Sequence, residues 1–200
     1  VSPPGGDISE PVTQNTLRIV KVFWGLDANL AYQRHFPAIN WLNSYSNYLD
    51  DMEPWFNENV KADWMQVRQH LMSLLTEEAS LNEIVKMVGM DALSPQDRLK
   101  MEAARSIRED FLHQNSFDEI DTYTSLPKQY DMMKLVYAFY EEGSKALKAG
   151  ANIEDIVNMQ VRERIGRFKY TAEDRIEAEY QSVQLALTTE AAALTQNKEG

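Results

Sequence analysis

The chain contains no cysteine among its 200 residues, so disulfide bridges and thiolate chemistry are excluded. No apolar run approaches the ~20 residues that a membrane-spanning helix needs. The first residues do not form a basic segment followed by an apolar one, as a secretory leader would. Because the chain starts with Val1 and not with methionine, we expect it to be a piece of a longer protein.

Positive charge is scarce relative to negative charge. Lys and Arg number 20 against 31 Asp and Glu, which gives a formal net charge of -11. Such a chain repels both a phosphate backbone and an anionic lipid surface. We therefore expect no nucleic-acid partner and no direct membrane insertion, and the 44% hydrophobic content is ordinary for a globular protein.

Two catalytic motifs are absent from the sequence. It has no G-x-x-x-x-G-K-[ST], whose backbone cradles a triphosphate, and no H-E-x-x-H zinc motif. The three histidines, His35, His70 and His113, are far apart along the chain, so surface or boundary positions are favoured over a triad or zinc site. We assign no catalytic and no metal-ligating residue in this chain.

The N-terminal segment has mixed structural signals. Residues 1–16 are rich in Pro, Gly, Ser and Asp and predict a loop. Residues 17–24 (LRIVKVFW) are β-branched and aromatic and predict a buried strand. A short helix is expected over residues 27–34, before Pro37.

From about residue 52 the apolar period becomes helical. An apolar stripe with steps of four and three predicts one buried helix face, and Ser80 with Glu83 fits a capping box that would begin a new helix. Gly89 can end that helix, and Ser94 followed by Pro95 is a strong helix start. The stripe consists of Val60, Trp64, Val67, Leu71 and Leu74.

Further helices are expected over residues 131–147 and 152–161, and from about residue 171. The predicted fold is mainly α, with a C-terminal bundle of about five or six helices after a small α/β piece. We place the boundary between residues 1–46 and 47–200. Residues 42–54, where Asn, Ser, Tyr and Asp accumulate, are a hypothetical hinge.

The N-terminal run from Ser2 to Trp41, with its His35-Phe36-Pro37 turn, is the most distinctive stretch of the sequence. It closely resembles the end of the nucleotide-binding domain in the catalytic A subunit (alpha chain) of V-type rotary ATPases. The resemblance implies that residues 1–46 are the end of a RecA-like domain, whose parallel sheet they help to complete, and that residues 47–200 are the helical domain.

A second stretch, residues 89–99 (GMDALSPQDRL), resembles the acidic loop by which the related F-type beta subunit pushes on the rotating central stalk. The resemblance implies stalk contact, although the sequence lacks the expected acids at three positions and would depend more on shape. The local residues alone indicate a well-capped helix–helix turn. The implied contact residues are Asp91, Ala92, Leu93, Ser94, Pro95, Gln96 and Asp97.

A third stretch, residues 111–123 (FLHQNSFDEIDTY), resembles the aromatic segment that lines the adenine pocket in the F-type subunit. The resemblance implies that Phe36, Phe117 and Tyr123 face adenine, whose flat ring suits aromatic stacking. The alternative for Phe117 and Tyr123 is a place in the core, where aromatic side chains are commonly buried.

The resemblance implies ATP or ADP with Mg²⁺ as ligands of the parent subunit, with the phosphate and metal ligands outside this chain. It implies B subunits, in an alternating hexameric ring, and central-stalk subunits as partners. It also implies a cytoplasmic location, peripheral to the membrane. Two rival hypotheses are a non-catalytic module of the same ancestry that only holds a ring together, and an unrelated helical adaptor.

Overall fold

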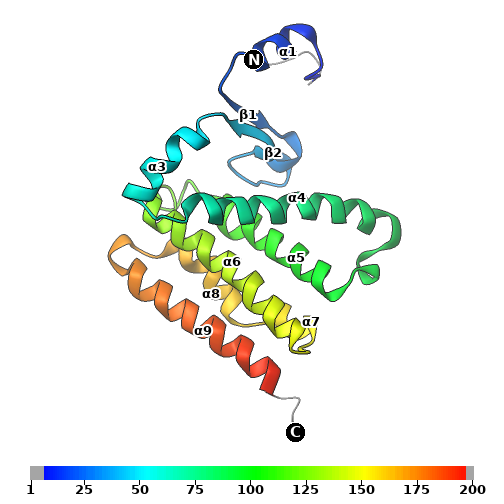
Figure 1. The fold of residues 1–200 in the computed structure, drawn as a ribbon, viewed down its shortest axis with the longest axis vertical. Coiled ribbons are helices and arrows are strands. Elements are labelled where there is room, and N and C mark those ends of the chain that lie inside the picture. Colours follow the sequence, from blue (N-terminus) through cyan, green and yellow to red (C-terminus); the bar gives the residue numbers. More distant parts are fainter. Residues whose placement is uncertain (1–6, 197–200) are drawn as a thin grey trace.

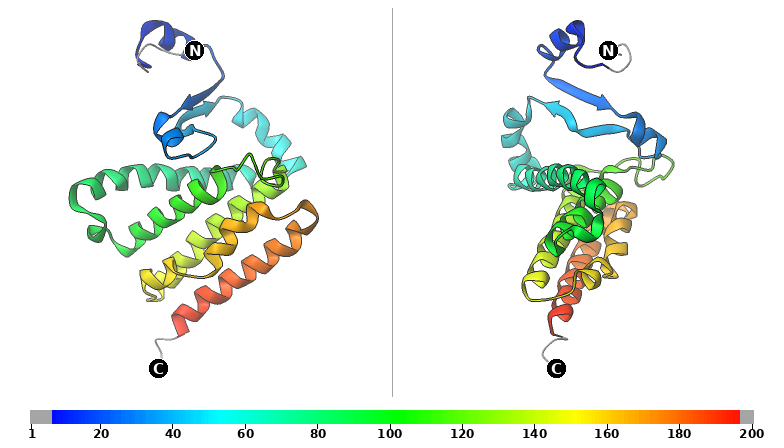
Figure 2. Two further views of the ribbon diagram at one scale, coloured as in Figure 1. Left: turned by 180° about the vertical axis from the view of Figure 1, so that it is seen from behind. Right: turned by 90° about the vertical axis from the view of Figure 1, so that its right-hand side faces the viewer.

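The N-terminal part of the protein is a β-hairpin flanked by short helices. The structure is a computed structural model that describes residues 7–196. The two strands pair antiparallel, with Val22 opposite Ser46 and Leu26 opposite Ile39. Figure 2 shows the hairpin standing above the helical body, with the first helix beyond it. The elements are α1 (Pro11–Leu17), β1 (Val22–Leu26), α2 (Ala28–Tyr32) and β2 (Ile39–Ser46).

The predicted loop over residues 1–16 is wrong from Pro11 onward, and residues 1–6 lie outside the described part. The Glu10 carboxylate accepts a hydrogen bond from the Thr13 backbone N–H at 2.8 Å and so caps α1. Pro11 at the first helical position has the backbone angle that a helix needs. The strand predicted over residues 17–24 is consequently displaced toward the C-terminus, and the prediction that it is buried is wrong, since Trp24 is 69% and Leu26 83% exposed. The short helix after Asp27 is confirmed as α2.

Strand β2 was not predicted, because its Asn and Ser residues are poor strand formers. One of them, Ser44, accepts a hydrogen bond from the Gly25 backbone N–H at 3.0 Å, beside an irregularity in the strand register. The side chain thereby replaces a missing ladder bond. The hypothetical hinge at residues 42–54 is occupied by the end of β2 and the start of helix α3 (Leu49–Asn59). This antiparallel pair also differs from the parallel sheet that the resemblance implies for the parent domain.

Helix α4 (Trp64–Val88) is continuous over 25 residues. The predicted stripe is confirmed from Trp64 to Leu74, where every member is buried. The predicted helix start at Ser80 is wrong, since the Ser80 hydroxyl donates to the Thr76 carbonyl at 3.5 Å within the running helix. Gly89 ends α4 as expected, with a φ of +85° that favours glycine.

The remaining predicted helices are present with shifted ends, but the short helix predicted over residues 152–161 ends at Val157, and the helix over Val161–Arg167 was not predicted. Ser125 caps the third long helix by accepting from the Lys128 backbone N–H, so that helix begins before Asp131. The final helix begins at Ile176 because a short 3₁₀ turn precedes it. The bounds are α5 (Pro95–Ser106), the π-helical turn η3 (Ile107–Leu112), α6 (Leu126–Lys148), α7 (Ile153–Val157), α8 (Val161–Arg167) and α9 (Ile176–Gln196), with 3₁₀ turns η2 (Met90–Ala92), η4 (Phe168–Tyr170) and η5 (Glu173–Arg175).

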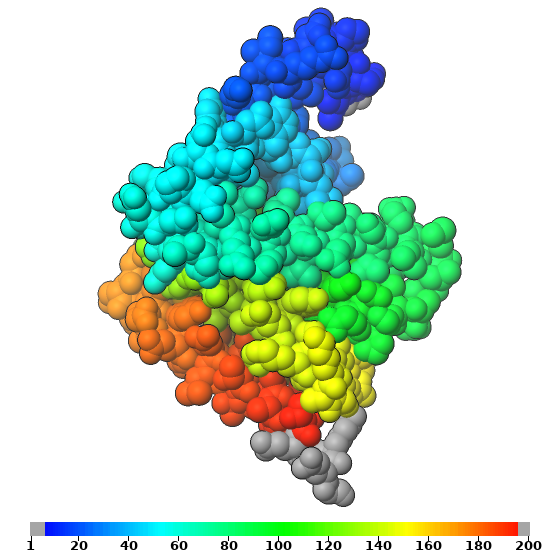
Figure 3. Space-filling model, in the orientation of Figure 1, coloured from blue at the N-terminus to red at the C-terminus, as the bar shows by residue number. Residues whose placement is uncertain are grey.

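The core lies between α6 and the helices on both of its sides. Helix α6 packs against α4 and α5 on one side and α9 on the other, which buries Leu99, Phe139 and Val183 almost completely. Helix α4 lies across the top of this bundle and separates it from the hairpin (Figures 1 and 3). The predicted fold class, mainly α with a small α/β piece at the N-terminus, is confirmed.

Two serines provide a matched test of the helix boundaries. The Ser94→Ala variant should lose about 1 kcal/mol of unfolding free energy, since the Ser94 hydroxyl accepts from the Asp97 backbone N–H at the start of α5. The Ser80→Ala variant should be neutral or slightly stabilising, because Ser80 is exposed within α4, where alanine is the better helix former. Urea denaturation followed by circular dichroism measures both, and an equal loss in the two variants would contradict the assignment.

Candidate functional site

The His35-Phe36-Pro37 turn contacts the loop that follows η3. The backbone N–H of Gln114 donates to the carbonyl of Phe36 at 2.8 Å, and the Phe36–Pro37 peptide bond is cis. This contact joins the hairpin to the helical domain across more than seventy residues of sequence. It brings together two of the three stretches that carry the family resemblance.

His35 fixes the turn on the helical side. Its side chain is buried, and its Nε2 lies 2.8 Å from the carbonyl oxygen of Arg108 in η3. The imidazole ring packs against the His113 ring and the Trp41 ring, with centroid distances of 5.2 and 5.7 Å. Of the two positions expected for His35, the surface position is therefore wrong, because the ring is buried at the boundary between the hairpin and the helical body.

His35 and His113 lie side by side, but His70 does not join them in a metal site. Burial lowers the pKa of His113, and the charge of Lys169 lowers it further. His70 instead stacks on Tyr137 with ring centroids 4.6 Å apart. Within residues 7–196 no group of three or more His, Asp or Glu side chains is arranged to hold a metal ion.

The loop between η3 and α6 is closed by its own polar side chains. The Gln114 side-chain amide donates to the carbonyls of Asp121 at 2.8 Å and Thr122 at 3.1 Å. The carboxylate of Asp121, which is only 2% exposed, accepts from the Asn115 backbone N–H at 2.6 Å. These bonds hold the two legs of the loop together, so its tip is supported and not simply a loose connection.

The three aromatic residues assigned to adenine are exposed. Phe117 is 98% exposed, Tyr123 84% and Phe36 50%. The core alternative for Phe117 and Tyr123 is therefore wrong in this chain.

An open hollow of about 790 Å³ lies beside Tyr123. Tyr123 and Pro37 lie on its wall, whereas Phe36 and Phe117 are not among its lining residues. Phe36 thus lies on the turn, and Phe117 and Tyr123 lie on the loop that this turn contacts, but no single pocket encloses the three rings. The remaining lining residues are Phe111, Leu112, Gln114, Asp121, Thr122, Thr124, Ser125, Gln129, Met132 and Glu173.

The predicted stalk-contact segment lies at the tip between α4 and α5, at one end of the helical body (Figure 1). Its residues divide into two groups. Leu93 is buried, and the Gln96 side-chain amide donates to the Tyr140 hydroxyl at 3.3 Å. The hydroxyl of Ser94 donates to the Asp97 carboxylate at 2.7 Å. This hydrogen bond is the main reason that the pKa of Asp97 lies below its ordinary value.

The outward side of this tip consists of Asp91, Ala92, Ser94 and Pro95. Beside it lies an exposed apolar surface that the sequence reasoning did not include. Its members, all at or near the end of α4, are Ile84 at 42%, Met87 at 77%, Val88 at 60% and Met90 at 43% exposed. The sequence signal that could have identified this surface is the presence of four large apolar residues next to a tight turn.

Two family models match the chain. Residues 53–157 match the C-terminal domain of V and A type ATP synthase, and residues 1–46 match the ATP synthase alpha/beta family, nucleotide-binding domain. None of the helices in the described range 7–196 has the length and apolar character that crossing a bilayer demands.

Curated relatives agree with the family models. The V-type ATP synthase alpha chain of Acetivibrio thermocellus is 60% identical over 97% of this chain and 33% of its own length. The corresponding chain of Clostridium botulinum is 63% identical over 88% of this chain and 30% of its own length. The present chain thus spans about a third of the length of these relatives.

The solved structure of ATP synthase subunit NeqB from Nanoarcheaum equitans shares the fold. It superposes with a TM-score of 0.58 at 20% identity and covers 68% of this chain and 32% of its own. From the family models and the curated relatives, the chain belongs to the family of V- and A-type ATP synthase alpha chains, of which it spans the C-terminal part.

Proposed function

We propose that this chain supplies the adenine side of the nucleotide pocket and the helical lever of a rotary V-type ATPase, which couples ATP turnover to proton or sodium transport. Residues 1–46 would be the end of the RecA-like nucleotide-binding domain, and residues 47–200 the helical domain. The observation that carries the proposal is the exposure of Phe117 and Tyr123 on a loop bonded to the Phe36 turn.

The residues present fit the base of a nucleotide but not its phosphates. Exposed aromatic faces suit a flat purine. A triphosphate needs a backbone cradle, a Mg²⁺ site and a carboxylate that orients water. The sequence lacks the cradle motif, and residues 7–196 hold no cluster of acids for a metal. Those groups would come from the rest of the parent subunit, and an arginine from a neighbouring B subunit.

In this arrangement the chain's own residues bind and orient. Phe36, Phe117 and Tyr123 would contact the base, and Gln114 would hold the turn and the loop in register through its backbone N–H and its side-chain amide. The chain alone should be catalytically silent, since none of these groups moves a proton or a phosphoryl group.

The tip between α4 and α5 would contact the central stalk. Of the two acids in the segment, Asp91 is exposed, whereas the Asp97 carboxylate is held by Ser94 and by Lys100 at 3.4 Å. Contact would therefore involve Asp91, Ala92 and the exposed methionines more than Leu93, Gln96 or Asp97. The parent would alternate with B subunits in a hexameric ring, on the cytoplasmic side and peripheral to the membrane.

Substitution of the exposed aromatic residues in the assembled enzyme tests the adenine assignment. Phe36→Leu and Phe117→Leu should each raise the KM for ATP by about 5- to 150-fold, because base stacking contributes ~1–3 kcal/mol. Steady-state hydrolysis assays measure this. Phe117→Tyr keeps an aromatic ring at this position, so its KM for ATP should equal that of the unsubstituted enzyme. Unchanged KM values in both leucine variants would refute the assignment.

Crosslinking tests the lever. This chain has no cysteine, so a single thiol at the exposed position of Ala92 can be labelled selectively within it. In the assembled motor, the Ala92→Cys variant carrying a maleimide-linked benzophenone should crosslink to a stalk subunit on illumination. Glu163→Cys provides the control, because Glu163 is exposed on α8 and not at the tip. Equal yields from the two variants, or none from Ala92→Cys, would reject stalk contact.

A further inference from the structure

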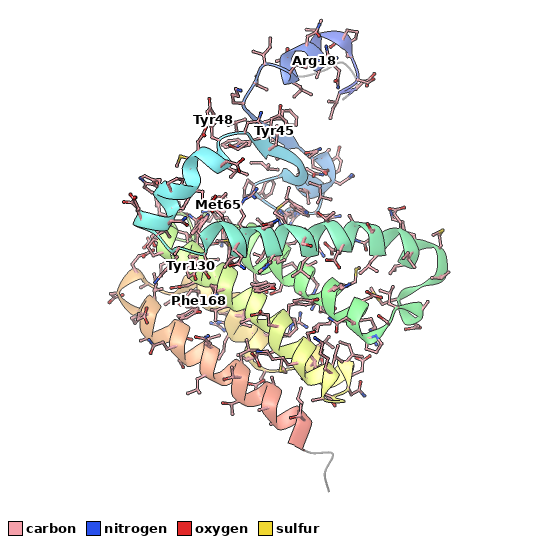
Figure 4. The ribbon with its side chains drawn as sticks, viewed as in Figure 1. Arg18, Tyr45, Tyr48, Met65, Tyr130 and Phe168 are labelled. Carbon is pink, nitrogen blue, oxygen red and sulfur yellow. The ribbon has the colours of Figure 1, made fainter. Side chains whose placement is uncertain are left out.

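A second pocket lies at the junction of α8, η4, η5 and α9, away from the tip between α4 and α5. Its volume is about 390 Å³, which is room for roughly a dozen water-sized groups. In Figure 4, Phe168 marks this junction in the helical body below α4. The lining residues are Arg164, Arg167, Phe168, Tyr170, Thr171, Arg175, Ala178 and Glu179.

The charge of this pocket is opposite to that of the chain. Three of the eight lining residues are arginines and one is an acid, whereas the whole chain carries a net charge of -11. The single acid, Glu179, is already paired with Arg164 at 2.9 Å. The pocket therefore has two arginines in excess of its acids.

The two remaining arginines are available to a ligand. Arg167 is 76% exposed, and its ion pair with Glu163, itself 77% exposed, is long at 3.5 Å. Exposed pairs of this kind contribute little and exchange partners easily. Arg175 is exposed and makes no ion pair with any residue in the described range 7–196.

The backbone below the arginines is held rigidly. The Lys128 ammonium is fully buried and donates to the carbonyls of Lys169 at 2.7 Å and Thr171 at 2.8 Å. Phe168 is 1% exposed and forms an apolar floor. Arg164 is also fixed, since it donates to the Ser182 hydroxyl at 2.8 Å in addition to Glu179. A rigid site loses less conformational entropy when a ligand binds.

We propose that this pocket binds the phosphate group of a small phosphorylated ligand. Guanidinium groups match the geometry of phosphate oxygens and form paired, charge-assisted hydrogen bonds with them. Arg167 and Arg175 contact the anion, Thr171 lies beside them with a hydroxyl donor, and the volume accommodates more than a single phosphate group. The pocket shares no lining residue with the hollow beside Tyr123.

Titration of the 200-residue chain with inorganic pyrophosphate tests the proposal. Backbone amide shifts are followed by NMR, with ionic strength held constant by potassium chloride. Shifts are expected over residues 164–179, and the double variant R167Q/R175Q should bind at least ~10-fold more weakly. Both arginines are exposed, so circular dichroism should show an unchanged fold.

A control variant at a distant arginine and a second anion sharpen the result. Arg18→Gln removes one positive charge from an exposed residue on the other side of α4 and should leave the affinity unchanged. Malonate, a dicarboxylate, should bind more weakly than pyrophosphate. Shifts that do not localise to residues 164–179, an affinity unchanged in R167Q/R175Q, or malonate binding as tightly as pyrophosphate would overturn the proposal.

Discussion

The architecture depends on how the carbonyl groups of the π-helical turn η3 are satisfied. The His113 backbone N–H reaches back five residues to the Arg108 carbonyl, and His35 lies against the same oxygen from the hairpin. Lys169 donates to the carbonyls of Glu109 and His113 at 3.1 and 2.9 Å. Buried carbonyls without hydrogen-bond partners cost free energy. The groups that satisfy these carbonyls come from the hairpin and from η4, which follows α8, so this one short turn joins those parts of the chain. π-Helical turns are frequent at functional sites.

Side chains extend this junction in both directions. Arg108 forms a two-pronged ion pair with Glu78 of α4, at 2.8 and 3.2 Å, and Glu78 is only 5% exposed. Lys128 of α6 holds the backbone at Lys169, and burial lowers its pKa. The aromatic loop leaves the end of η3, and α4 is tied to the same turn through Glu78.

Local signals in the sequence predicted the helical part well, because caps and apolar stripes act over a few residues. Ser94, Gly89 and the stripe from Trp64 are examples. The false helix start at Ser80 shows the limit, since α4 runs without a break from Trp64 to Val88 through a capping pattern. The partners of His35, Lys128 and Lys169 lie between 41 and 73 residues away, and no local pattern contains them. The adenine assignment came from resemblance alone, and the exposure of Phe117 supports it in a way that composition cannot, because aromatic residues are more often buried.

The most direct test of the η3 junction measures hydrogen exchange in a His35→Phe variant of the 200-residue chain. Phenylalanine keeps a ring against His113 and Trp41 but lacks the nitrogen that faces the Arg108 carbonyl. Amides of β1 and β2 should therefore exchange about tenfold faster, while those of α6 keep their protection. His70→Phe, which preserves a ring against Tyr137, should leave the hairpin unchanged. Unaltered hairpin protection in His35→Phe would contradict the claim that η3 joins the two domains.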